Sequence, residues 1–144
     1  MSVRRSLCAL AVLALGCVAA LAADVPYGDT GPKDAPVHVL VFAPNSPCQL
    51  PVADALKKLQ KDSPKLLRVT IEPMGSKLAK EMKIGCASYL MRVKGVKPPK
   101  AKANGEYEVL FTKSPEVGKW KVEQLVAKVN AGLKKVAEKP ESET

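Results

Sequence analysis

A short apolar run between residues 37 and 42 constrains the fold more than any other feature of the sequence. It reads VHVLVF, and a run of this length and composition is typical of a central strand that is buried on both faces. Residues 43–47 then form a turn signal, in which Asn45 or Ser46 can cap a helix and Pro47 suits its first turn. The sequence therefore predicts a strand, a tight turn and a helix in direct succession.

Further apolar periodicities continue along the chain. The predicted strands cover residues 37–42, 66–72, 87–93 and 107–111, and the predicted helices begin after Pro47, at Gly75-Ser76 and at Lys121. The last helix, residues 121–136, has the clearest pattern, because its apolar residues form one stripe with lysines opposite: Val122, Leu125, Val126, Val129, Leu133 and Val136. The element order βαβαββα predicts an α/β fold with a mixed four-stranded sheet flanked by helices.

The ends of the chain do not fit this pattern. Residues 1–23 have two early arginines, an apolar stretch and a small-residue cleavage site near Ala22 or Ala23, which together predict a signal peptide. The apolar stretch is shorter than the roughly 20 residues that cross a bilayer, so we expect no transmembrane segment. The mature protein is thus expected to be periplasmic or secreted.

The rest of the chain is predicted to form one domain. Residues 24–36 are rich in Gly, Pro and Asp and predict an extended lead-in to a domain at 37–136. Residues 137–144 are charged and interrupted by proline, which predicts a disordered tail. No internal repeat is present.

The charge of the chain limits its partners. The formal net charge is +9, and nearly all of the basic residues after the signal peptide are lysines. Nucleic-acid recognition depends strongly on arginine forks and aromatic stacking, and only 4% of this chain is aromatic, so no nucleic-acid partner is expected. The lysines are interpreted as a solvated surface, with weak attraction to an anionic envelope surface as the alternative. The lysine-rich loop at residues 94–105 is interpreted either as a solubilising segment or as a partner-binding insertion.

The layout resembles the thioredoxin-like superfamily over about residues 37–136, because Cys48 follows the first strand and turn at the start of a helix. The lead-in Gly31–Val37 is also similar to the segment before the first core strand in periplasmic disulfide oxidases and isomerases. In that family, two thiols spaced Cys-x-x-Cys lie at the N-terminus of the first helix, and a cis-proline loop before the third core strand packs against them. The resemblance implies a thioredoxin-like fold and thiol–disulfide chemistry.

The family motif is incomplete in this chain. Either Asn45–Cys48 occupies it and the attacking cysteine is lost, or Cys48–Pro51 occupies it and the resolving cysteine is lost. Ser88 stands where the family has cis-proline. Since a cis bond before a residue other than proline costs about 2.5–4 kcal/mol, the bond before Ser88 is expected to be trans.

The same resemblance implies a second thiol for the site. Cys86 falls in the loop that faces the helix N-terminus carrying Cys48, so these cysteines are the candidate catalytic pair and also a candidate disulfide. An exported chain permits such a bond. A thiolate at a helix N-terminus is stabilised by backbone N–H groups, which makes Cys48 the candidate nucleophile, Cys86 its partner, and a protein thiol or disulfide the expected substrate.

Other readings of the cysteines remain open at the level of the sequence. Cys48 and Cys86 could form an inert staple, or stay idle, in a non-catalytic binding or structural module. With Met82 or Met91 they could hold a soft monovalent metal, although these methionines fit core positions better. His38 has no recognisable catalytic partner, and no cofactor motif is present, so neither a cofactor nor a metal is expected.

Overall fold

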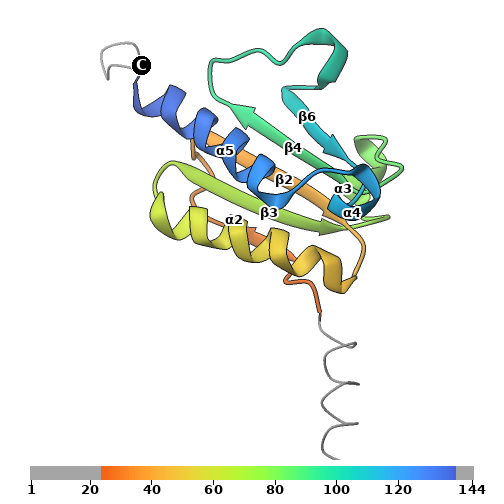
Figure 1. Cartoon of the computed structure of the whole chain (residues 1–144). Helices are drawn as coiled ribbons and strands as arrows, with labels where there is room; N and C mark the ends of the chain where they lie inside the picture. The colour runs from red at the N-terminus through yellow and green to blue at the C-terminus, as the bar shows by residue number, and fades with distance from the viewer. Residues whose placement is uncertain (1–23, 139–144) are drawn as a thin grey trace, which may run out of the picture.

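A six-stranded mixed sheet forms the middle of the molecule, and helices pack against it (Figure 1). This computed structural model describes residues 24–138. The predicted signal peptide and residues 139–144 of the predicted tail lie outside the described residues. Within the described range, no helix combines the length and the apolar character needed to span a membrane.

The elements alternate along the chain much as the sequence predicts. The strands are β1 (Gly28–Thr30), β2 (Val37–Ala43), β3 (Leu67–Pro73), β4 (Ser88–Val93), β5 (Ala103–Asn104) and β6 (Tyr107–Thr112). The helices are η1 (Pro47–Gln49), α2 (Leu50–Asp62), α3 (Lys77–Glu81), η2 (Lys100–Lys102), α4 (Pro115–Gly118) and α5 (Val122–Ala137).

The prediction of a mixed α/β fold is confirmed, but the prediction of four strands is wrong. The strand order is β1-β3-β2-β4-β6-β5, in which β2 runs parallel to β3 and every other pair is antiparallel. The four predicted strands are the four central ones. The extra strands β1 and β5 are short, and each pairs with the outer edge of a predicted strand. They form because β3 and β6 would otherwise leave backbone N–H and C=O groups unpaired.

Strand β2 is the centre of the sheet, and all of its residues are buried. Val37, Val39 and Val41 point to the face that is covered by α2 and α5, where Leu56 and Leu125 are fully buried. Figure 1 shows these two long helices lying side by side across the sheet. Alternate side chains of β2 enter the cores on the two faces of the sheet, so the strand must be apolar along nearly its whole length.

On the opposite face, α3 packs against one end of the sheet. There Leu40 and Phe42 pack with Ala79 of α3, and Met82 packs against the same cluster. Met91 belongs to the core under α5. Met91 is thus a core residue and Met82 is partly buried against the second cluster, so both fill the packing positions that the sequence favours for them. Toward the other end of this face lie polar side chains, His38 among them.

Candidate functional site

Cys48 lies in η1, the single turn that joins β2 to α2. Its side chain is partly buried, and its Sγ atom is 2.7 Å from the hydroxyl oxygen of Ser46. Pro47 opens this turn, as the sequence predicts. Because η1 leads directly into α2, the thiol lies at the beginning of the longer helical segment.

The predicted capping roles of Asn45 and Ser46 are corrected by the structure. Ser46 occupies the N-cap position of η1, but its side chain makes no capping hydrogen bond. The Ser46 hydroxyl is instead directed to Cys48. The side-chain oxygen of Asn45 accepts a 2.9 Å hydrogen bond from the backbone N–H of Val25. Neither side chain caps the helix, because Asn45 holds the lead-in and Ser46 contacts the thiol.

A series of hydrogen bonds between buried side chains anchors this turn to the sheet. The residue after Cys48, Gln49, is 2% exposed. Its side-chain carbonyl accepts a 2.5 Å hydrogen bond from the phenol of Tyr89, and its amide donates to the Ser114 hydroxyl at 2.7 Å. Burial raises the pKa of Tyr89 to about 12, although its hydrogen bonds to Gln49 and Ser114 act in the opposite direction. The phenol therefore remains a neutral donor beside the thiol.

Aromatic side chains pack next to these hydrogen-bonded residues. The Tyr89 ring meets Trp120 edge to face at 4.8 Å, and Trp120 stacks on Phe111 at 4.3 Å. The Trp120 indole donates a hydrogen bond to the Lys113 carbonyl, and the Lys113 N–H donates to the carbonyl of Ala87. The loop before α5 is thereby fixed to the segment that carries Cys86.

Cys86 is exposed, and it lies two residues before β4. Ser88 pairs with Phe42 near the end of β2, and its hydroxyl donates a 2.9 Å hydrogen bond to the carbonyl of Cys86. Every peptide bond between residues 24 and 138 is trans, including the one before Ser88, as expected. Cys48 and Cys86 therefore lie at the same end of two adjacent strands, and both are free thiols in this structure.

His38 belongs to a polar network that the sequence did not reveal. Arg68 forms an ion pair with Asp29 at 2.7 Å, and this contact is the main cause of the lowered pKa of that carboxyl. The ionised Asp29 accepts a 2.8 Å hydrogen bond from the Thr70 hydroxyl. The Thr70 oxygen in turn lies 2.7 Å from Nε2 of His38, and Nδ1 of His38 lies 2.6 Å from the Tyr107 hydroxyl.

The direction of this network follows from its members. Thr70 has one hydroxyl proton, which it gives to Asp29, so Nε2 of His38 must be the donor to Thr70. Nδ1 is then unprotonated and accepts from Tyr107. Burial lowers the pKa of His38 to about 4, with further lowering by Arg68 and Arg92. His38 is thus a neutral, fully hydrogen-bonded group, as expected of a packed strand histidine.

Residues that could hold a metal are not assembled anywhere between residues 24 and 138. No group of three or more histidine, cysteine or acidic side chains comes together there. Within the same range, every buried side-chain nitrogen or oxygen has a hydrogen-bond partner.

No known protein family, curated protein or solved structure matches this chain. What the protein does must therefore be inferred from its own residues. The two thiols differ from the His38 network in one respect: the network uses its polar groups internally, whereas Cys86 is exposed and Cys48 is only partly buried. The thiols are the stronger candidates for chemistry on another molecule.

Proposed function

We propose that the protein is an exported, thioredoxin-like thiol–disulfide exchange protein in which Cys48 attacks and Cys86 resolves. The observation that carries this proposal is the placement of two free, accessible thiols at one end of strands β2 and β4, one of them at the entry to α2. The order β3-β2-β4-β6, with one parallel and two antiparallel pairings, supports the thioredoxin-like assignment.

The proposed reaction has two balanced steps. The Cys48 thiolate attacks one sulfur of a partner disulfide, which forms a mixed disulfide and releases the other partner sulfur as a thiolate. The Cys86 thiolate then attacks the Cys48 sulfur, closes a Cys48–Cys86 bond and releases the second partner sulfur. The partner is reduced by two electrons and the two cysteines are oxidised. The reverse sequence oxidises a partner dithiol.

The surroundings of Cys48 suit this role. The Ser46 hydroxyl, 2.7 Å from Sγ, can donate to the thiolate when the thiol loses its proton. The anchored Gln49 side chain limits movement of the turn that carries the sulfur. Export would place the protein where partner disulfides persist, since such compartments are oxidising.

The exchange reaction can be tested with matched cysteine variants. With oxidised glutathione as the probe, Cys86→Ser should accumulate a mixed disulfide on Cys48, because the resolving thiol is missing. Cys48→Ser should form none on the same time scale, and the wild type should form the internal bond. All three proteins should show the same urea unfolding under reducing conditions.

Two results would overturn the proposed function. Equal rates of glutathione incorporation into Cys48→Ser and Cys86→Ser would show two unrelated surface thiols. An internal bond with a reduction potential below about −300 mV would indicate an inert structural staple.

A further inference from the structure

An open groove lies beside the lysine-rich loop, away from the thiols. Its volume is about 760 Å3, within the roughly 300–1,000 Å3 that is typical of ligand sites. Its lining comes from three places: the lead-in before β2, the end of β4 and the loop that follows β4. The groove therefore forms only in the folded chain, although most of its residues belong to one segment.

Apolar side chains form part of the groove wall. Val93, at the end of β4, is buried, and Val96 and Pro98 follow it in the loop. Val96 is 37% exposed and is one of only three large hydrophobic side chains in the described residues with such exposure. Together with Val93 and Pro98, this partly exposed valine gives the groove an apolar wall.

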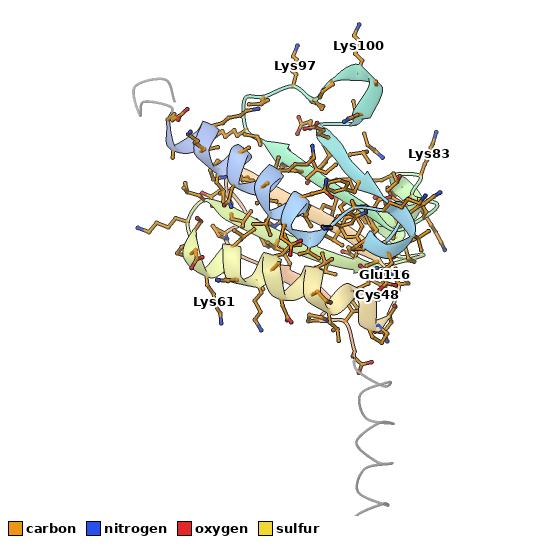
Figure 2. All side chains as sticks on the ribbon, viewed as in Figure 1. Cys48, Lys61, Lys83, Lys97, Lys100 and Glu116 are labelled. Carbon is orange, nitrogen blue, oxygen red and sulfur yellow. The ribbon has the colours of Figure 1, made fainter. Side chains whose placement is uncertain are left out.

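The charge around this wall is predominantly positive. Five basic residues line the groove, namely Lys33, Arg92, Lys94, Lys97 and Lys100, against two acidic residues, Asp34 and Glu106. Figure 2 shows Lys97 and Lys100 extending from the loop at separate points. A single anionic headgroup would be bound by converging cations, whereas dispersed cations match several carboxylates along a chain.

We propose that this groove binds an acidic segment of a partner polypeptide in which carboxylates alternate with apolar side chains. The carboxylates would pair with the basic rim, and the apolar side chains would cover Val96 and Pro98. The Arg92 guanidinium lies over the Tyr107 ring at 5.2 Å and 3.8 Å from Glu106, so its position is fixed and part of its charge is already paired.

The groove is independent of the proposed thiol chemistry. Cys86 lies just before the start of β4, whereas the groove is lined by Val93 at the end of this strand. Figure 2 shows Cys48 and the pair Lys97 and Lys100 on opposite sides of the molecule. Failure of either proposal therefore leaves the other standing.

The experiment measures binding of a short fluorescent peptide of alternating glutamate and leucine to the chain from residue 24 to residue 144. The charge-reversal variant Lys97→Glu/Lys100→Glu should weaken binding about tenfold or more, because two attractive pairs become repulsive. The matched control is Lys57→Glu/Lys61→Glu on the exposed side of α2, which changes the net charge equally. It should leave the affinity nearly unchanged.

Further probes define the occupant. Val96→Ser should weaken binding of the alternating peptide, and a lysine–leucine peptide should not bind. The proposal is overturned if the alternating peptide does not bind, if both charge-reversal variants weaken it equally, or if pure oligoglutamate binds as tightly. It is also overturned if anionic vesicles bind through Lys97 and Lys100 while the peptide does not. Tight binding only after removal of residues 139–144 would assign the groove to this chain's own acidic end instead.

Discussion

The phenol of Tyr89 donates a 2.5 Å hydrogen bond to the side-chain carbonyl of Gln49, the residue that follows Cys48. This bond joins the central strand β4 to the turn that carries the thiol. Both side chains are almost completely buried, at 0% and 2% exposure. The position of Cys48 thus depends on a buried polar contact between residues that are 40 positions apart.

Removal of the Tyr89 hydroxyl should destabilise the protein. Tyr89→Phe keeps the ring against Trp120 but leaves the Gln49 carbonyl without its donor. A buried acceptor left unsatisfied costs about 1–3 kcal/mol, and we expect a loss of free energy of unfolding in that range, measured by urea denaturation.

Tyr27→Phe is the matched control, because the Tyr27 hydroxyl also donates one hydrogen bond, to the Ala43 carbonyl, but the residue is 36% exposed. Water can replace that bond, so the loss should be smaller. An equal loss in the two variants would contradict the importance assigned to the buried contact.

The His38 network predicts a pH-dependent stability. The pKa of His38 is about 4 in the folded protein, against an ordinary value of 6.5. Between these values the unfolded chain binds the proton and the folded chain does not, so stability is present above about pH 6.5 and is lost as the pH falls toward 4. The loss is on the order of 3 kcal/mol, obtained from the shift at 1.36 kcal/mol per pKa unit.

The comparison protein for this prediction is His38→Gln, whose amide can accept from Tyr107 and donate to Thr70. Its unfolding free energy should vary less than that of the wild type between pH 6.5 and pH 4. Parallel curves for the two proteins would show that other groups, such as Asp29, produce the dependence.

Gly31 is expected to be the most sensitive glycine of the lead-in. Its φ is +101°, and a Cβ atom there would lie 2.5 Å from the backbone carbonyl oxygen of Leu67. Gly31→Ala should therefore cost more than about 2 kcal/mol, through backbone strain together with steric overlap. Gly28→Ala has a positive φ of +141° but open space around the new atom. Thermal unfolding should give Gly31→Ala a much lower melting temperature than Gly28→Ala, and the opposite order would contradict the close approach of Gly31 to Leu67.

The central elements were predictable because apolar side chains define them. The continuous apolar run at residues 37–42 forms a strand that is buried on both faces, and the stripe of α5 buries side chains at helical spacing, so both elements appear where their patterns predict. Strands β1 and β5 were not predictable, because Gly28–Thr30 and Ala103–Asn104 have no such pattern. Strand β1 forms by pairing with β3, which is distant in sequence, and β5 forms by pairing with β6 across a turn.

The candidate site was only partly predictable for a similar reason. Local order places Cys48 at the entry to a helix, and the predicted strands bring Cys86 to the same end of the sheet. Thr70 and Tyr107 hydrogen-bond to His38 across 32 and 69 positions, and Asp29 joins the network through Thr70, 41 positions away. Register between strands decides such contacts, and no local pattern encodes it.

The most direct test of the proposed thiol chemistry is to determine the oxidation state of the two thiols after equilibration with a glutathione redox buffer. Acid quenching, alkylation and peptide mass analysis would report the state of Cys48 and Cys86 at each potential. We expect a single intramolecular Cys48–Cys86 bond that forms and opens reversibly, at a potential above about −300 mV. Two thiols that remain free in the most oxidising buffer, or that form only separate glutathione adducts, would contradict it.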